Sequence, residues 1–502
     1  MKKIFILFGL IIISGLSGCK PEFKNPVNPD DVQADAGDAD FTRYVALGNS
    51  LTAGYMNGTL YKSGQANSFP KLLADRMKEA GGGEFTQPYL DDDTKDIGGM
   101  VMGNQVILQP KLIVDAGQGT VERINETPTM QLAPHPGPYN NMGVPGAKIF
   151  HYVFNGYGDI ANVPAGLANP YFVRMASSPN VSVLQDAVSQ NPTFFTLWLG
   201  NNDVLWYATS GGDGTNQTGN PDPATYGPND LTDPGLFAYL YNQMLQALTA
   251  NGAKGCVATL PDVASIPYMT TVPYNPVPLS DAQAQALNQA YAQYNGGLQV
   301  ALQNGLITQE EANKRTIHFE AGQNALVIQD EYLTDLTSLG LPSIRQTTAN
   351  DLVVLPASGI IGKPDPNNPN LLLGITSPLE DKWVLTEDEI AETRAVTNQM
   401  NDAIRALAQQ YDLAVVDMAA AMDELVQGLR LDDNSIYTAD YFSGLATMPN
   451  LFFSLDGVHP NTKGYVILAN KFIDAINAKY HSTLRHYDPG YFPTNITIKT
   501  QN

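Results

Sequence analysis

The stretch YVALGNSLTAGY, residues 44–55, is the part of the chain around which the rest is organised. Its first four residues form a short apolar run, which predicts a buried strand. The run breaks at Gly48 and presents Ser50 directly after it, before a second glycine at Gly54. A serine on a tight turn after a core strand is where a parallel α/β sheet presents a nucleophile. The alternative is that the Gly-Asn-Ser triplet is an ordinary turn, since all three residue types favour turns.

The composition limits the class of protein. A chain of 502 residues has room for several domains, or for one domain with large insertions. The formal net charge of −22 repels phosphate backbones, so nucleic acid is not expected as a partner. No nucleotide-binding loop or metal-binding pattern is evident, and we expect neither a cofactor nor a metal. The acidic run at 91–93 lacks the alternating ligand spacing of a calcium loop.

The N-terminus has the layout of a secretory signal. Two lysines precede an uncharged apolar run from Ile4 to Ile13, which is too short to span a membrane. Leu16-Ser17-Gly18-Cys19 resembles the lipobox of bacterial lipoproteins, which implies cleavage before Cys19 and lipidation of its thiol. The alternative is an ordinary signal peptide that contains a cysteine. We therefore expect a signal peptide over residues 1–18, a flexible tether over 19–40 and a lipid anchor in the cell envelope, at the outer membrane.

Four apolar runs predict the strands of a central sheet. They cover residues 44–48, 193–199, 255–260 and 413–417. Helical patterns with cap or stop signals are expected over 68–77, over 236–250, from 386 and over about 462–477. Strands that alternate with helices predict a parallel sheet with helices on both faces, and a ligand site beyond the carboxyl ends of the strands. Cys256 lies inside one apolar run and is expected to be a small buried side chain, without a disulfide partner if Cys19 is lipidated.

Four stretches exceed the connections that such a sheet needs. They are residues 84–138, 205–233, 267–384 and 425–450. The longest, 267–384, contains a capping box at Ser280 and several strand-like runs, so it predicts an inserted cap subdomain rather than a loop. The folded domain is expected to span residues 41–480, and residues 481–502 are expected to form a C-terminal tail.

One set of polar residues could form an acyl-transfer site. Such a site needs a nucleophile, a base, a group that orients the base, and donors for the developing oxyanion. Of six histidines, only His459 sits in a compact Asp-Gly-x-His-Pro turn before a capped helix, with Asp456 three residues earlier. That spacing can place the carboxylate on the second imidazole nitrogen, although a surface turn is the alternative for the pattern alone. The candidate oxyanion donors are the backbone N–H groups of Ser50 and Gly146 and the amide of Asn202.

In order along the chain, these motifs resemble the blocks of the SGNH (GDSL) hydrolase family. The similar stretches are Gly48-Asn49-Ser50-Leu51, Asn141 to Gly146, Gly200-Asn201-Asn202-Asp203 and Asp456-Gly457-Val458-His459-Pro460. The resemblance implies a three-layer flavodoxin-like parallel sheet. It also implies Ser50, His459 and Asp456 as catalytic residues, and an oxyanion hole made by Ser50, Gly146 and Asn202. The chain departs from the family at Asn49, where Asp is usual, and it has no Gly-x-Ser-x-Gly nucleophile elbow.

The sequence therefore predicts a lipid-anchored serine esterase or lipase-like hydrolase. Its substrate would be a small-molecule, lipid or glycan ester, cleaved through an acyl-enzyme. Two alternatives stay open. One is a non-catalytic surface lipoprotein that binds a ligand or glycan on the same fold, which Asn49 and the large insertions favour. The other is acyl transfer to a sugar, or removal of an acetyl group from one, with the same chemistry at Ser50.

Overall fold

The computed structural model describes residues 33–90 and 95–499. Residues from Ala34 onward form one unit. The signal peptide, Cys19, most of the expected tether and the acidic run at 91–93 lie outside the described residues. Within the described ranges, no helix is both long enough and apolar enough to cross a membrane.

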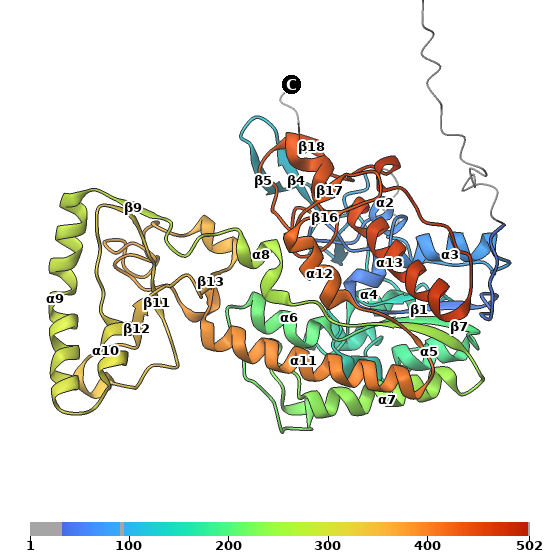
Figure 1. Cartoon of the computed structure of the whole chain (residues 1–502), viewed down its shortest axis with the longest axis horizontal. Helices are drawn as coiled ribbons and strands as arrows, with labels where there is room; N and C mark the ends of the chain where they lie inside the picture. The colour runs from blue at the N-terminus through green and yellow to red at the C-terminus, as the bar shows by residue number, and fades with distance from the viewer. Residues whose placement is uncertain (1–32, 91–94, 500–502) are drawn as a thin grey trace, which may run out of the picture. The chain divides into compact units, whose positions relative to one another are not determined.

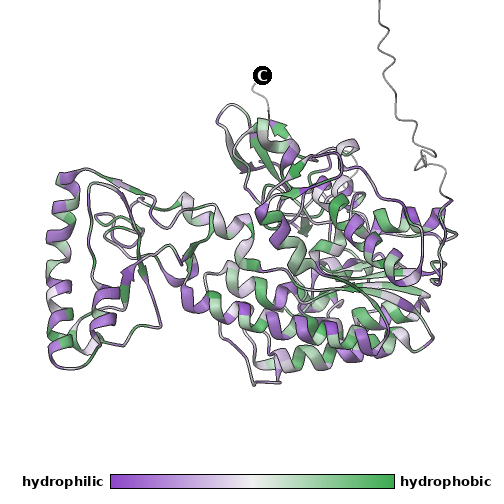
Figure 2. Cartoon of the chain, viewed as in Figure 1, coloured by the Kyte–Doolittle hydropathy of each residue, from purple (hydrophilic) through white to green (hydrophobic). Residues whose placement is uncertain are grey.

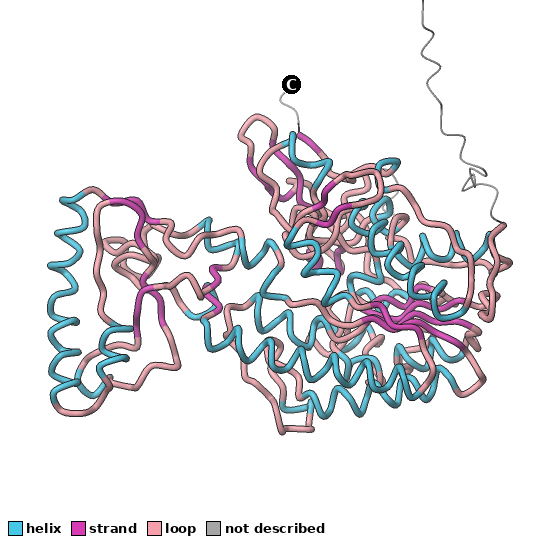
Figure 3. Tube along the Cα trace, in the orientation of Figure 1, coloured by secondary structure: helices cyan, strands magenta, loops and turns pink. Residues whose placement is uncertain are grey.

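A five-stranded parallel sheet lies at the centre (Figures 1 and 3). Its strands are β1 (Tyr44–Gly48), β6 (Asn141–Gly143), β7 (Phe194–Trp198), β8 (Lys254–Ala258) and β15 (Ala414–Val416). They lie in the order β15-β8-β7-β1-β6, and each neighbouring pair is parallel. Counting these five alone, the order is 2-1-3-4-5, the flavodoxin-like order of a doubly wound fold. The α/β class and the parallel sheet expected from the sequence are confirmed.

One strand of this sheet differs from the prediction. Asn141 to Gly143 is not among the four runs that predict strands, but it pairs in parallel with Ala46 to Gly48 as edge strand β6. A Cβ at Gly143 would lie 2.4 Å from the backbone nitrogen of Ala53, so only glycine allows this close approach. The strand has three residues and is rich in Asn and Gly, so its composition favours a turn.

Helices cover both faces of the sheet. α3 (Phe69–Glu79) and α13 (Thr462–Tyr480) pack together on one face, while α5 (Val183–Ser189), α7 (Pro234–Thr249) and α11 (Glu387–Gln410) lie on the other (Figure 1). α6 (Asn201–Thr209) follows β7 and packs against α11. The strands are predominantly apolar, and each helix turns an apolar stripe toward them (Figure 2). The shorter helices are α1 (Ser50–Ala53), α2 (Lys62–Gln65), α4 (Pro170–Met175), α8 (Pro267–Thr270) and α12 (Met418–Gln427).

The stretch 277–346, which we call the inserted lobe, has its own secondary structure and small cores (Figure 1). It consists of β9 (Val277–Leu279), α9 (Asp281–Gln303), α10 (Gln309–Arg315), β10 (Gly322–Asn324), β11 (Val327–Gln329) and β12 (Ile344–Gln346). Ser280 and Gln283 form the capping box that starts α9, as the sequence predicts. β13 (Leu352–Val353) and β14 (Val384–Leu385) then pair and lead the chain into α11.

Short hairpins occupy two of the other long connections. The first connection contains β2 (Met100–Met102) with β3 (Gln105–Leu108), and β4 (Leu112–Asp115) with β5 (Thr120–Arg123); β16 (Leu429–Arg430) pairs with β17 (Ile436–Tyr437) in the last. β18 (Ile498–Lys499), within the expected C-terminal tail, pairs with β4. At the other end, the backbone of Asp35 and Thr483 is joined by a hydrogen bond of 2.9 Å. Both ends of the described chain therefore lie against the folded body.

Candidate active site

Ser50 lies on a tight turn, and neighbouring atoms pack closely around it. β1 ends at Gly48, where a Cβ would lie 2.2 Å from the Thr52 hydroxyl and 2.4 Å from the Trp198 carbonyl. Asn49 caps α1 by accepting the N–H of Leu51 at 3.3 Å. Ser50 is thus the first helical residue, which leaves its own N–H without an intrahelical partner.

The structure brings Ser50, His459 and Asp456 into one hydrogen-bonded chain. Ser50 Oγ lies 2.8 Å from His459 Nε2. His459 Nδ1 lies 3.0 Å from Asp456 Oδ2. Ser50 and His459 are separated by 409 positions in the chain, so this meeting is made by the fold and not by local sequence. The distances are those that a base needs to take a hydroxyl proton while a carboxylate orients it.

Hydrogen-bond donors surround the Asp456 carboxylate. Oδ1 accepts the backbone N–H groups of Val458 at 2.9 Å and His459 at 2.8 Å, and the Ser454 hydroxyl at 3.1 Å. Oδ2 accepts the N–H of Gly58 at 2.8 Å as well as the imidazole. Burial by itself would raise the pKa of Asp456, but the charge of His459 and these hydrogen bonds outweigh it and lower the pKa to about 2. Asp456 is therefore ionised at neutral pH.

A second turn, Met56 to Thr59, holds this carboxylate from outside its own loop. Asn57 and Gly58 both have left-handed backbone conformations, with φ of 53° and 78°. The Asn57 backbone N–H bonds to Ser454 Oγ at 2.9 Å, and its side-chain Oδ1 accepts the N–H of Leu455 at 3.1 Å. The sequence analysis missed this turn, although the Asn-Gly pair is a common signal for a tight turn with two left-handed residues.

Tyr55 covers the base. Its ring lies 4.5 Å from the imidazole of His459, centroid to centroid, at an angle of 44°. Its hydroxyl donates to the Gly58 carbonyl at 2.7 Å, and its own carbonyl accepts the hydroxyl of Tyr465 at 2.6 Å. Sequence analysis did not single out Tyr55, because one tyrosine after a glycine carries no local signal of its partner. The ring limits the positions that the imidazole can take.

The three oxyanion candidates follow the strands β1, β6 and β7, at the carboxyl edge of the sheet. Gly146 has a φ of 81°, which favours glycine, and within the described chain neither its N–H nor that of Ser50 has a hydrogen-bond acceptor. Asn202 lies in the first turn of α6 and is buried. Its amide donates to the Ala147 carbonyl at 3.0 Å, which fixes the side chain and leaves its second N–H available. These free donors are what an oxyanion would require.

Asp203, next to Asn202, ties α6 to the loop that carries Gly146. Its two carboxylate oxygens lie 3.2 and 3.1 Å from the backbone nitrogen of Ile149. Burial raises the pKa of Asp203 to about 7, although the nearby charge of Lys148 lowers it. The two oxyanion blocks of the sequence are thus joined through buried contacts.

Trp206 forms an exposed wall beside Gly146. It lies one helical turn after Asn202, so both side chains share a face of α6. Its ring carbon Cζ2 lies 3.7 Å from where a Cβ on Gly146 would be, and 43% of the side chain is exposed. Trp206 was not predicted as a site residue, because it falls in the stretch 205–233, for which no helix was expected.

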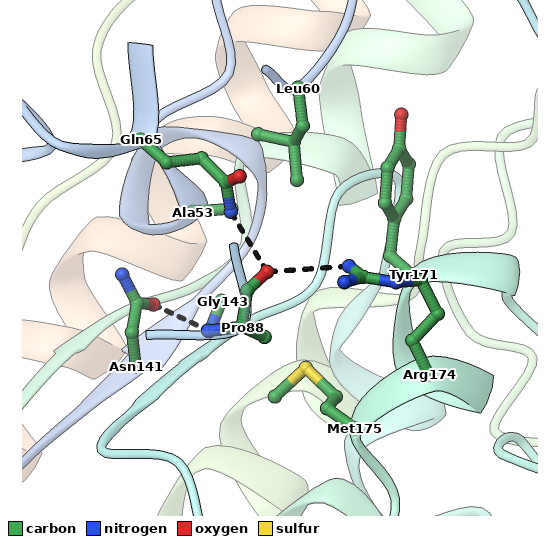
Figure 4. Close-up of a pocket in the computed structure, with 9 residues that line it drawn as sticks. All are labelled: Ala53, Leu60, Gln65, Pro88, Asn141, Gly143, Tyr171, Arg174 and Met175. Atoms are coloured by element: carbon green, nitrogen blue, oxygen red, sulfur yellow. Dashed lines mark hydrogen bonds between the residues drawn. The ribbon is translucent and has the colours of Figure 1, made fainter. Parts of the chain in front are cut away.

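A small cavity lies between α1, α2, α4 and β6 (Figure 4). The Pro88 carbonyl in its wall accepts from Gln65 at 3.1 Å and from Arg174 at 3.3 Å. The cavity has room for about one water molecule, which is too small for an ester substrate. Over the ranges that the structure describes, no cluster of three acidic, histidine or cysteine side chains could hold a metal ion. Cys256 is fully buried in β8, as predicted.

No family model and no curated protein matches the chain. Among solved structures, it is similar to a GDSL-like lipase from Parabacteroides merdae, with 8% identity and a TM-score of 0.32, over 89% of this chain and 100% of that one. An alpha/beta hydrolase enzyme from the metagenome of Lake Arreo in Spain is 12% identical with a TM-score of 0.31, over 88% and 96%. A mutant of an acetyl-xylooligosaccharide esterase from Geobacillus stearmophilus is 10% identical with a TM-score of 0.30, again over 88% and 96%. At such identities and TM-scores, the function has to rest on the geometry of the site.

Proposed function

We propose that this protein is a serine esterase of the SGNH (GDSL) type. The observation that carries the proposal is the hydrogen-bonded chain from Ser50 through His459 to Asp456. Two further observations support it. Asp456 is held ionised, and the backbone N–H groups of Ser50 and Gly146 have no acceptor in the part of the chain that the structure describes. A protein that only binds a ligand on this fold does not need all of these features together.

The first half of the reaction forms an acyl-enzyme. Ser50 Oγ attacks the ester carbonyl while His459 Nε2 takes its proton, and Asp456 stabilises the resulting imidazolium. The oxyanion accepts hydrogen bonds from the N–H groups of Ser50 and Gly146 and from the amide of Asn202. When the carbon–oxygen bond to the alcohol breaks, His459 returns the proton to the leaving alkoxide.

The second half repeats this chemistry with water. His459 takes a proton from water as the water attacks the acyl carbonyl, and it then protonates Ser50 Oγ as the acid leaves. If a sugar hydroxyl replaced water, the protein would be an acyltransferase, and only analysis of the products separates the two. The proposed lipid anchor at Cys19 would hold the enzyme in the cell envelope, at the outer membrane.

Ser50→Ala tests the proposal directly. Turnover of a short-chain aryl ester should fall by at least about 10⁴-fold, because the nucleophile is removed. Ser358→Ala is a matched control, because Ser358 is an exposed serine whose hydroxyl bonds only to a local carbonyl. Covalent labelling by an aryl phosphonate should be lost in Ser50→Ala and kept in the control. Equal activity in Ser50→Ala and wild type would refute the assignment.

A further inference from the structure

The hairpin β4–β5 places Arg123 at the outer side of the candidate active site. Leu112 and Arg123 face each other at its open end. The N–H of Leu112 donates to the carbonyl of Asn57 at 2.7 Å, which docks the hairpin on the Met56–Thr59 turn. This hairpin belongs to the 84–138 stretch, which the motifs of the active site do not involve.

The Arg123 guanidinium is fixed but has no charged partner among residues 33–90 and 95–499. Nη1 donates to the Pro110 carbonyl at 2.5 Å. Nη2 and Nη1 lie 3.3 and 3.4 Å from where a Cβ on Gly58 would be, so the glycine gives the group its space. The side chain is exposed, and among the described residues no carboxylate pairs with it. In a chain with 50 acidic and 28 basic residues, an exposed arginine without an acidic partner is a cationic point where a negatively charged group can bind.

Contacts place this cation on the histidine side of Ser50. Gly58, against which Arg123 lies, donates its N–H to Asp456 and accepts the hydroxyl of Tyr55. The Tyr55 ring in turn lies against the imidazole of His459. Because His459 returns its proton to the leaving alkoxide, the alcohol part of an ester would lie on this side of the nucleophile.

We propose that Arg123 recognises a negatively charged group, a carboxylate or a phosphate, on the alcohol part of the ester substrate. The inference rests on the proposed esterase function and names the substrate class of the same site. A planar guanidinium with free N–H donors binds such groups with two parallel hydrogen bonds. The competing explanation is that Arg123 only holds the hairpin on the turn, and the experiment has to separate the two.

The test uses two aryl acetates that differ in one group. In 4-acetoxybenzoate the leaving phenol carries a para carboxylate, and in its methyl ester the same position is neutral. The quantity measured is the ratio of kcat/KM for the charged ester to that for the neutral one. Intrinsic reactivity cancels when this ratio is compared between wild type and variants. A third ester, 4-acetoxyphenyl phosphate, shows whether phosphate or carboxylate is preferred.

Arg123→Gln should lower this ratio about five- to tenfold, mainly through a higher KM for the charged ester, with little change for the neutral one. Arg123→Lys should retain part of the preference. The wild-type ratio should fall as salt is raised, because an exposed charge is screened. Arg430→Gln is the matched control, since Arg430 is also an exposed arginine, and its nearest partner is the neutral Asn434, at 3.5 Å.

The outcomes are distinct. If Arg123→Gln leaves the ratio unchanged, or lowers both activities equally, Arg123 has no recognition role and this inference is wrong, while the esterase function stands. If the wild-type protein cleaves neither ester and no phosphonate labels Ser50, the proposed function fails and this inference fails with it.

Discussion

Asp456→Asn probes the group that orients the base. Oδ1 accepts from Ser454, Val458 and the backbone of His459, and Oδ2 accepts from Gly58 and the imidazole. Since all of these neighbours donate, an asparagine NH₂ group faces donors in either orientation. The orientation that keeps the two backbone bonds from Val458 and His459 loses the bond from Gly58 and points the NH₂ at His459 Nδ1. The single N–H proton of the neutral imidazole then lies on Nε2. That nitrogen can no longer accept the hydroxyl proton of the nucleophile Ser50.

The structure sets the size of two effects. The pKa of Asp456 is about 2, compared with the usual value of 3.8. At 1.36 kcal/mol per pKa unit, the folded state stabilises this carboxylate by about 2 kcal/mol. A lowered pKa means that this stability is present above the unfolded value of about 4 and is lost as the pH falls through about 2. Asp456→Asn should therefore lower Tm at pH 7, and kcat should fall about 10³- to 10⁴-fold because the histidine has the wrong tautomer.

The assay is steady-state hydrolysis of a short-chain aryl ester at pH 7, with Tm measured on the same samples. The control is Asp433→Asn, because Asp433 lies in an exposed turn where its carboxylate accepts the N–H of Ser435. The control should keep both kcat and Tm. If Asp456→Asn keeps kcat within tenfold of wild type, Asp456 does not orient the base and the geometric reasoning is refuted.

Three further predictions concern the oxyanion site, the inserted lobe and a buried acid. Asn202→Ala should lower kcat about 10²- to 10³-fold with little effect on KM, measured on the same ester. Asp351→Ala leaves the buried Arg345 without its bidentate partner, at 2.6 and 2.8 Å, and should cost about 3–5 kcal/mol of unfolding free energy in urea. Burial, and then the charge of Asp381, raises the pKa of Glu389 to about 8, so the folded state keeps a proton that the unfolded chain releases near pH 4.5. Stability should fall as the pH rises between those values, and Glu389→Gln should flatten that part of the Tm–pH curve.

Local patterns in the sequence were enough to predict four of the five strands of the central sheet and the long helices that cover it. β1, β7, β8 and β15 are apolar runs, and the sheet order follows the rules of a doubly wound fold. The Asp456–His459 spacing also predicted a contact, since both residues lie in one turn. These features could be predicted because each depends on residues that are close in the sequence, or on the general rule that the strands of such a sheet run in parallel.

Contacts between distant segments could not be predicted in this way. The N–H of Gly58 donates to Asp456, which is 398 positions away in the sequence. No local sequence pattern near either residue predicts this contact. β6 has the composition of a turn and is a strand only because β1 lies beside it. Arg123 becomes a candidate for recognition through a hairpin whose docking partners, Asn57 and Gly58, lie more than fifty residues away. Such features depend on which backbone groups meet in the folded chain.

Asn49 is the position where the chain departs from the SGNH blocks, and its surroundings predict what aspartate would do there. The side chain is fully buried, its Oδ1 accepts one N–H at 3.3 Å, and its Nδ2 has no partner among the described residues. Aspartate removes that unpaired donor, but when ionised it buries a charge with a single donor, so its pKa should be raised. A raised pKa means that stability is kept at low pH and lost as the pH rises.

Asn49→Asp should therefore match wild type near about pH 3.5, below the unfolded pKa of an aspartate, and be less stable by about 1–3 kcal/mol at pH 8, measured by urea unfolding at both values. Asn368→Asp is the control and should show no such difference, because Asn368 lies in an exposed turn where its Oδ1 accepts the N–H of Asn370. Equal stability of Asn49→Asp and wild type at pH 8 would show that the site supplies donors for a second charge-assisted bond. The asparagine would then be a neutral replacement, instead of one that this buried turn requires.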